Sequence, residues 1–411
     1  MSFKMNWAKA NWVMYICLLV LTDSCKREVR SKLVAPVKVC GSITVYDKSK
    51  VFDGYNLKDG DIYGMNGVLL AAYPGEQCAY FQNGTIVAGV EDHLQLFTSD
   101  LTTVWRTPDF QHKGVHHEIF IAPDSSIFFL SSEMDPMPVP KQKSLVNTPF
   151  SDSAVSSFYY HLNAIDRPGM LRFDRMYHIA RNGTILGYWS SYQYLADLQK
   201  LIAQNRNPYY ADTLTRIGRE YFHFNSIQPL PHNPYEKTNP AFRAGNLLLG
   251  EMYFDMSFIM DPNTFEILWF YFQPEANGHG QHSPRMLANG NILMYVNQCT
   301  LPDSAHTKYS KVVEINPLTK QVEWEYTATP PQAMFGDYGG HAQRLPNGNT
   351  LISVDTPSND TTQKSVVLEV TRQKEVVWKW YPDLSQTTIP GLYRVNRVSK
   401  EDMKQFVQKR F

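Results

Sequence analysis

The sequence predicts an all-β fold, a six-bladed β-propeller closed by strands from both ends of the chain. A unit of two β-hairpins recurs along the chain, with alternating apolar strands joined by short polar turns. The histidines that begin consecutive units are 59 residues apart in both cases: His223, His282 and His341. The tryptophans that end the same units are 55 and 54 residues apart: Trp269, Trp324 and Trp378. Repeated four-stranded units of this size form the blades of a propeller.

Two consecutive units define the repeat. The first begins at His282-Ser-Pro-Arg and turns at Asn289-Gly, and the second begins at His341-Ala-Gln-Arg and turns at Asn347-Gly. Each continues into a second hairpin, with strands at 312–315 and 322–326 in the first unit and at 367–371 and 376–380 in the second. Two hairpins make four antiparallel strands, which is one blade.

Three more units follow the same pattern. One starts at His223, one runs from His117 to Trp189 with a segment inserted between its hairpins, and one spans 79–105 without a leading histidine. The stretches 43–73 and 392–398 are left over at the two ends of the chain. We expect them to build a sixth blade together, which leaves only short sheet edges exposed.

Two segments interrupt the repeat. Residues 196–203 and 213–221 have helical spacing of apolar residues, which predicts two short helices. The insertion that begins at 134 is rich in Pro and Ser and is expected to be a loop. The domain prediction is one propeller domain over 41–411, with insertions at about 134–170 and 190–221.

The N-terminus has the pattern of an export signal. Lys4 and Lys9 precede an apolar run, 12–21, that is too short to span a membrane. Ser24 followed by Cys25 resembles a lipoprotein signal over 1–24, with Cys25 as the lipidation site and 25–40 as a linker. The prediction is an exported, membrane-anchored lipoprotein, periplasmic or at the cell surface; an ordinary cleaved signal, or a cysteine there by coincidence, are the alternatives.

Charge, hydrophobic content and cysteine count exclude several classes of protein. The chain has 411 residues with 39 Lys+Arg and 39 Asp+Glu, so its formal charge is zero and no electrostatic footprint for nucleic acid exists. A hydrophobic content of 43% excludes a disordered chain. Cys40, Cys78 and Cys299 are odd in number and form no C-x-x-C pair, which predicts no disulfide framework and no zinc site, although a bridge between Cys40 and Cys78 is conceivable.

Four histidines occupy the same place in their units: His117, His223, His282 and His341. The first strand of a propeller blade lines the central axis. Side chains far apart in the sequence should therefore converge there into a ring. A single histidine at a strand start often caps a turn or completes a core hydrogen bond, but blade packing gives no reason for imidazole at four equivalent positions.

Converging imidazoles can bind a metal, act as acid and base, or attack as nucleophiles. No carboxylate stands at metal-ligand spacing and no H-E-x-x-H pattern is present, so no metal and no cofactor are expected. The sequence also has no G-x-S-x-G motif, phosphate-binding loop or dinucleotide-binding glycine pattern. Protonation of the histidines near neutral pH would decide whether the mouth attracts an anion.

The string from Phe224-Asn-Ser-Ile through Asp261-Pro, Gln281-His282, Glu323-Trp-Glu-Tyr and Gln343-Arg-Leu-Pro-Asn-Gly-Asn-Thr resembles the bacterial arylsulfotransferase family, which uses no nucleotide sulfate donor. The resemblance covers about 51–398 and is strongest over 223–380. It implies a six-bladed propeller that moves a sulfate group from one phenolic ester to another phenol through a sulfated histidine.

Carried over by position, the resemblance implies His341 as the nucleophile. It implies that His282 and His223 bind sulfate oxygens or relay the phenolic proton, with His117 and Asn225 as further substrate-binding residues. The family's central arginine falls at Lys311 here, which supplies a charge without a bidentate fork. Arg285 and Arg344 each follow a ring histidine by three residues, and strand alternation is expected to point them to the opposite face.

The expected partners are a small aromatic sulfate donor and a phenolic acceptor, with no nucleic acid and no membrane contact beyond the lipid anchor. Two other functions fit the same sequence. One is a binding propeller for a sulfated glycan or another anion, and the other is a purely structural surface lipoprotein. Turnover of a chromogenic aryl sulfate that depends on an added phenol distinguishes the enzyme from both.

Overall fold

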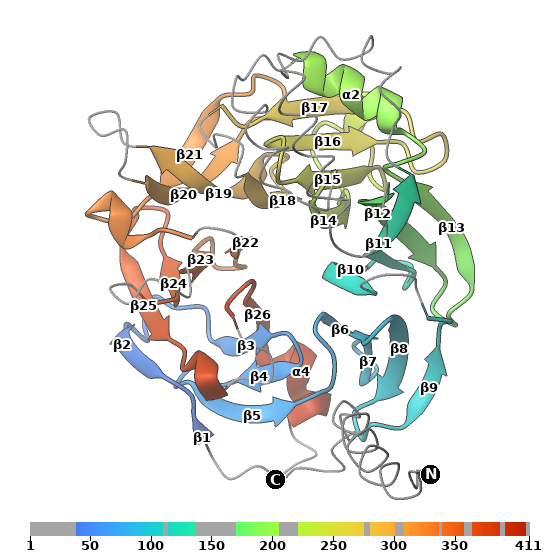
Figure 1. The fold of residues 1–411 in the computed structure, drawn as a ribbon. Helices are drawn as coiled ribbons and strands as arrows, with labels where there is room; N and C mark the ends of the chain where they lie inside the picture. The colour runs from blue at the N-terminus through green and yellow to red at the C-terminus, as the bar shows by residue number, and fades with distance from the viewer. Residues whose placement is uncertain are drawn as a thin grey trace, which may run out of the picture. The chain divides into compact units, whose positions relative to one another are not determined.

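The computed structural model confirms the propeller. It describes residues 38–109, 114–136, 170–204, 221–274, 280–300, 308–336, 339–356, 364–386 and 391–407. Six antiparallel sheets stand around a common axis (Figure 1), four of them with four strands and two with five. The predicted leader, Cys25 and most of the predicted linker lie outside the described residues, as does most of the insertion that begins at 134.

The four-stranded blades follow one another along the chain. Their strands are β6 (Cys78–Tyr80), β7 (Thr85–Val90), β8 (His93–Thr98) and β9 (Thr103–Arg106); β10 (Val115–Ile121), β11 (Ile127–Pro136), β12 (Met170–Ile179) and β13 (Ile185–Ser190); β14 (Phe224–Pro229), β15 (Leu247–Glu251), β16 (Met256–Met260) and β17 (Ile267–Phe272); and β18 (Gln281–Met286), β19 (Ile292–Thr300), β20 (Lys308–Ile315) and β21 (Val322–Tyr326). The innermost strand comes first in each blade, as the repeat predicts.

Both ends of the chain close the ring. The fifth repeat, β22 (Gly339–Arg344), β23 (Thr350–Asp355), β24 (Val366–Val370) and β25 (Val376–Tyr381), gains β2 (Ser42–Tyr46) as a fifth strand. The sixth blade combines the C-terminal β26 (Asn396–Ser399) with β3 (Gly54–Lys58), β4 (Asp61–Tyr63), β5 (Val68–Ala72) and β1 (Lys38–Val39). A sixth blade shared by both ends of the chain is confirmed. The expectation that all of 43–73 belongs to it is wrong for β2, which pairs with β25 in the fifth blade.

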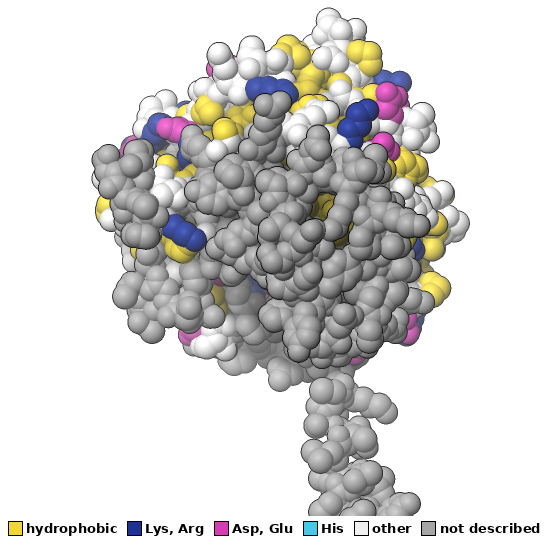
Figure 2. Space-filling view, turned by 45° about the horizontal axis from the view of Figure 1, so that its top comes forward, with side chains coloured by type: hydrophobic (Ala, Val, Ile, Leu, Met, Phe, Trp, Pro, Cys, Tyr) yellow, Lys and Arg dark blue, Asp and Glu magenta, His cyan; other side chains and the backbone are white. Residues whose placement is uncertain are grey.

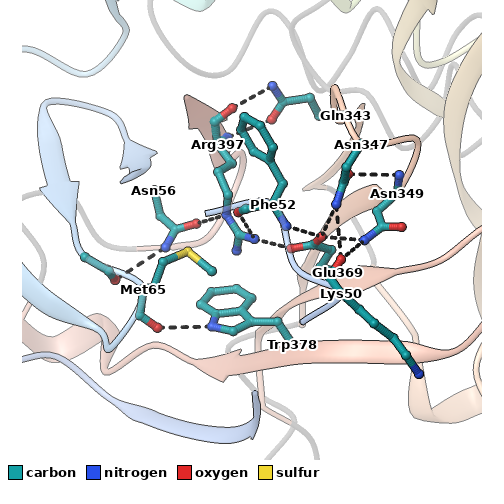
Figure 3. A network of polar contacts seen from close by, with 11 residues as sticks. Lys50, Phe52, Asn56, Met65, Gln343, Asn347, Asn349, Glu369, Trp378 and Arg397 are labelled. Atoms are coloured by element: carbon teal, nitrogen blue, oxygen red, sulfur yellow. Dashed lines mark hydrogen bonds and ion pairs between the residues drawn. The ribbon is translucent and has the colours of Figure 1, made fainter. Parts of the chain in front are cut away.

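A buried polar network joins the closing strand to the fifth blade (Figure 3). The guanidinium of Arg397 from β26 pairs with Glu369 of β24, donates from Nε to Asn56 Oδ1 at 2.9 Å and lies 4.3 Å from the centre of the Trp378 ring. Arg397 and Glu369 side chains are both fully buried. Breaking such a pair costs about 3–5 kcal/mol because a charge is left buried alone, so this contact holds the ring shut.

The even spacing of the tryptophans has a structural cause. Four closing tryptophans donate the indole N–H to a backbone carbonyl of the next blade at 2.9–3.0 Å: Trp105 to Arg181, Trp269 to Pro317, Trp324 to Arg372 and Trp378 to Met65. Trp189 of the second blade stands at a different register, opposite Met176. The same residue at the same place therefore fastens successive blades together.

Helices are few. α2 (Leu195–Gln204) confirms the first predicted helix and buries Leu198, Leu201 and Ile202, while the second predicted helix lies almost entirely outside the described residues. The unpredicted α4 (Lys400–Val407) follows the closing strand and buries Met403, Phe406 and Val407. Short 3-10 turns occur at Pro240–Phe242, Pro331–Ala333 and Leu384–Gln386. None of the helices in the described ranges is long and apolar enough to cross a membrane.

Charged side chains of both signs stand among the coloured residues of the face in Figure 2. On the face in Figure 2, basic and acidic groups are scattered among apolar and polar ones, without a field of one sign. This agrees with the zero formal charge of the sequence.

Candidate active site

The inner strands bring the four histidines to the middle of the ring. His117 lies in β10, His282 in β18 and His341 in β22, and His223 stands immediately before β14. The rings of His117 and His223 have centroids 4.5 Å apart, and their Nε2 atoms are 2.8 Å apart. Tyr393, just before the closing strand, lies 4.9 Å from the His117 ring and 5.7 Å from the His282 ring. The Tyr393 ring thus lies between the His117–His223 pair and His282.

Local backbone features aim these side chains. β10 has a β-bulge that includes His117, which has a positive φ of 58°, and β18 has one just after His282, where Ser283 has a φ of 55°. β22 is regular, and there Gly340 has a φ of 148°. A Cβ at that glycine would lie 2.3 Å from Cε1 of Tyr295. The close approach of β22 to Tyr295 therefore requires glycine beside His341.

His282 is held in one tautomer. Its Nδ1 is 2.6 Å from Asn297 Oδ1, and the Nδ2 group of Asn297 donates to the carbonyls of Gly336 and Gly339 at 3.1 and 3.0 Å. The amide can only present its oxygen to the imidazole, so Nδ1 carries the proton and Nε2 has the free lone pair. That Nε2 is buried and has no hydrogen-bond partner among the described residues.

His341 repeats this arrangement with the ring nitrogens exchanged. Its Nε2 is 2.9 Å from Oδ1 of Asn396, which belongs to the closing strand β26. Its Nδ1 is buried and has no hydrogen-bond partner in the described part of the chain. Both His282 and His341 therefore keep one buried imidazole nitrogen that no atom of the described residues satisfies.

Burial favours the neutral form of three of the four imidazoles. It lowers the pKa of His282 to about 3 and, with the positive charges of Arg394 and Arg285, lowers the pKa of His341 well below its usual range. Burial and the neighbouring His223 do the same to the pKa of His117. These directions run against the expectation that the three histidines attract an anion by protonation near neutral pH.

The permanent charge comes instead from two arginines. Arg285 of β18 and Arg394 both pair with Oε1 of Glu118, whose Oε2 accepts the backbone N–H of Ile227 at 2.7 Å. Arg394 also donates from Nη2 to Ser283 Oγ at 2.9 Å. The expected orientation of Arg285 away from the centre is wrong, since the bulge after His282 resets the strand alternation.

The other predicted residues have different surroundings. Arg344, on the regular strand β22, does point away, and it pairs with Glu314 at 2.6 Å. Lys311 lies on β20, the third strand of its blade, with its ammonium 3.2 Å from Glu325 of the outer strand β21. Asn225 is fully buried and uses both ends of its amide to hold β18, donating to Gln281 O at 2.7 Å and accepting from Ser283 N at 3.3 Å. The structure thus brings the histidines together but leaves Lys311 on the outer side of its blade.

Sequence reasoning missed Arg394 and Asn396. A signal for Arg394 exists in the segment Arg394-Val-Asn-Arg, which has the spacing of His282-Ser-Pro-Arg and His341-Ala-Gln-Arg. Asn396 leaves no comparable signal, because its role depends on its contact with His341 of the neighbouring blade.

A cavity of about 330 Å³ adjoins the two arginines. Its walls combine polar groups of the ring with apolar side chains of the inner strands and α4, among them Glu118, Arg285, Arg394, Ile119, Val398 and Met403. Among the described residues no group of three or more His, Cys, Asp or Glu side chains could hold a metal ion.

Comparisons with known proteins support the fold and identify the family. A crystal structure of a protein of unknown function from Bacteroides caccae is similar over 84% of this chain and 99% of its own, with a TM-score of 0.52 and 14% identity. The dihydro-heme d1 dehydrogenase NirN aligns less closely, with a TM-score of 0.39 and 11% identity over 88% of this chain and 69% of its own. No curated protein matches the sequence. A family model described as Arylsulfotransferase (ASST) matches residues 162–381, which include His223, His282 and His341. Because that match covers more than half of the sequence, the chain belongs to the arylsulfotransferase family.

Proposed function

We propose that the protein transfers a sulfuryl group from an aryl sulfate ester to a phenolic acceptor, through a covalent intermediate on a histidine of the ring. Family membership supports a sulfotransferase. The observation that carries the finer proposal is the pair of buried, unpartnered imidazole nitrogens, Nδ1 of His341 and Nε2 of His282, beside two guanidinium groups. A neutral imidazole with a free lone pair is the state that a nitrogen nucleophile requires.

His341 is the proposed nucleophile. Its Nδ1 lone pair attacks sulfur, an N–S bond forms, and the S–O bond to the donor breaks with the electron pair leaving on the phenolate, which then takes up a proton. In the second half, the acceptor phenol loses its proton as its oxygen attacks sulfur, and the N–S bond returns its electrons to His341. Arg394 and Arg285 both act electrostatically on His341, which makes this imidazole the better candidate of the two.

The remaining histidines have proposed roles in binding and proton transfer. Nε2 of His282 has its lone pair fixed by Asn297, so it can accept a hydrogen bond from an acceptor phenol. His117 and His223 share a hydrogen bond through their Nε2 atoms, which lets one ring pass a proton to the other.

The test is a two-substrate assay of the purified protein. Release of nitrophenol from 4-nitrophenyl sulfate should be sustained only when a second phenol is present, and His341→Ala should abolish it. Saturable binding of aryl sulfates without turnover, unchanged in His341→Ala, would instead establish a binding propeller.

We also propose that the chain is exported and anchored through a lipid on Cys25. The support is the sequence pattern alone: a short apolar run that ends in Ser24-Cys25. Labelled palmitate should be incorporated into the wild type and not into Cys25→Ala; incorporation into both would contradict the assignment.

A further inference from the structure

We propose that Arg394, which lies just before the closing strand β26, binds the sulfuryl oxygens and takes the place of the cation expected at Lys311. This inference rests on the proposed function for its substrate, but its anion-binding part can be tested without turnover.

The register of the repeats places Arg394 in the ring. Arg344 follows His341 by three residues, pairs with Glu314 and lies 4.9 Å from the centre of the Trp324 ring. Arg397 follows Arg394 by three residues and has the same surroundings one blade later, paired with Glu369 and 4.3 Å from the centre of the Trp378 ring. If Arg397 corresponds to Arg344, Arg394 corresponds to His341. The sixth blade thus carries an arginine where the fifth carries the proposed nucleophile.

The contacts of Arg394 leave capacity for an anion. Its side chain is only 11% exposed, with Nη1 on Glu118 and Nη2 on Ser283 Oγ and, more weakly, on the Asn225 carbonyl at 3.4 Å. Its Nε is buried and has no hydrogen-bond partner among the described residues. Its charge also contributes to the lowered pKa values of His117, His282 and His341, so it acts on three of the four ring histidines.

The local charges do not cancel. Arg285 and Arg394 share the single carboxylate of Glu118, and the second oxygen of that carboxylate is occupied by the N–H of Ile227. Two guanidinium groups and one carboxylate leave a net charge of one positive unit on Arg285, Arg394 and Glu118. A sulfate monoester carries one negative charge, and guanidinium binds such tetrahedral oxyanions in a fixed geometry. Lys311, by contrast, already faces the carboxylate of Glu325.

The segment that carries Arg394 also closes the propeller. Asn396, which bonds His341, and Arg397, which locks β26 to the fifth blade, come from the same short segment. The anion site is therefore complete only after the C-terminal strand has closed the propeller.

The experiment compares Arg394→Gln and Arg394→Lys with Lys311→Gln and with a matched control, Arg243→Gln. Arg243 is 60% exposed and pairs with Asp261 on the surface, so its loss removes a guanidinium without touching the ring. The first measurement is binding of inorganic sulfate to each folded variant by calorimetry. Arg394→Gln should weaken it at least about tenfold, Arg394→Lys less, and the other two not at all.

The second measurement separates binding from chemistry. Arg394→Gln should raise KM for 4-nitrophenyl sulfate at least about tenfold. In Arg394→Gly, added guanidinium at low concentration should restore turnover, which a purely structural role would not allow. Added guanidinium should not rescue His341→Ala.

Two results would overturn the proposal: sulfate binding and KM that respond to Lys311→Gln and not to Arg394→Gln, or an Arg394→Gly variant that folds and is not rescued. If the wild type binds sulfate through Arg394 but never turns over an aryl sulfate, the anion site stands and the proposed transferase function fails.

Discussion

The two sides of the histidine ring use the same side chain in different ways. His117 and His223 bond to each other, Nε2 to Nε2 at 2.8 Å. His282 and His341 each bond to an asparagine instead, and each keeps one buried nitrogen without a partner among the described residues. A bonded pair can share and pass a proton, whereas an imidazole fixed by an amide oxygen presents a lone pair. The partner of each imidazole, and not its place in the repeat, therefore sets its chemistry.

The difference originates in neighbouring strands. Asn297 lies near the end of β19 and is oriented by the carbonyls of Gly336 and Gly339, and Asn396 begins the closing strand. On the other side, Glu251 positions His223 by accepting its backbone N–H at 2.9 Å, together with the N–H groups of Tyr253 and Phe254. Burial raises the pKa of Glu251 to about 7. Glu251 thus fixes the backbone at His223, and the imidazole of His223 hydrogen-bonds to that of His117.

The largest expected effect comes from removing the imidazole of His341, whose Nδ1 has no hydrogen-bond partner among the described residues. His341→Ala should lower kcat by about a thousandfold or more, because the covalent route is lost, while the thermal midpoint changes little. Steady-state kinetics with 4-nitrophenyl sulfate and phenol measure this. Near-normal turnover in a folded His341→Ala protein would contradict the proposal that the asparagine-bonded histidines, and not the His117–His223 pair, carry the covalent step.

A smaller loss of activity is expected when His282 keeps its Nε2 lone pair but Asn297 no longer fixes the orientation of the imidazole. Asn297→Leu removes the acceptor of His282 Nδ1 and leaves two buried carbonyls without their donor. We expect kcat/KM to fall about 10–100-fold and stability to fall by about 1–3 kcal/mol. Asn347→Leu, at a turn far from the ring, is the matched control and should leave kcat/KM unchanged; equal losses in both would show a general packing effect.

Substitution in the hydrogen-bonded pair of His117 and His223 should cost less activity. His117→Gln preserves a side chain that can hydrogen-bond to His223 and should slow turnover about tenfold, at the acceptor step more than at the donor step. Single-turnover measurements of each half-reaction distinguish the steps. A thousandfold loss at the donor step would give His117 the role that we assign to the other side.

The smallest effect is the acid sensitivity of the donor step. Since the pKa of His282 is about 3 and that of His341 is well below its usual range, this step should keep its rate between pH 8 and about pH 5. A rate that falls with a midpoint near 6.5 would contradict buried, neutral imidazoles.

Stability should respond to acid in a direction set by the same pKa values. In the unfolded chain the histidines titrate at about 6.5 and bind more protons than the folded chain below that pH. The contribution of these histidines to the free energy of unfolding should therefore decrease as the pH falls from about 6.5 towards 3, the value for His282. Glu251, with its pKa raised from 4.5 to about 7, contributes in the opposite direction between those two values, so the histidine part is the difference between the wild type and His282→Ala. Urea unfolding at several pH values measures it.

The sequence predicts the blades and the convergence of the histidines because both depend on spacing that recurs in the chain. It does not predict Arg285, since a bulge at Ser283 reverses its direction, and a bulge has no clear signature here. Arg394 was missed because the closing strand is short and begins its repeat with arginine instead of histidine. The neutral state of the ring depends on burial, which no spacing shows.

The central claim is that a sulfuryl group resides on an imidazole whose second nitrogen is held by asparagine. The most direct measurement is mass spectrometry of peptides from protein treated with 4-nitrophenyl sulfate alone, quenched in base, with and without a later chase of phenol. We predict one added SO3 on the peptide that contains His341, which disappears after the chase. Modification of His117 or His223, or steady turnover with no modified histidine at all, would contradict the account.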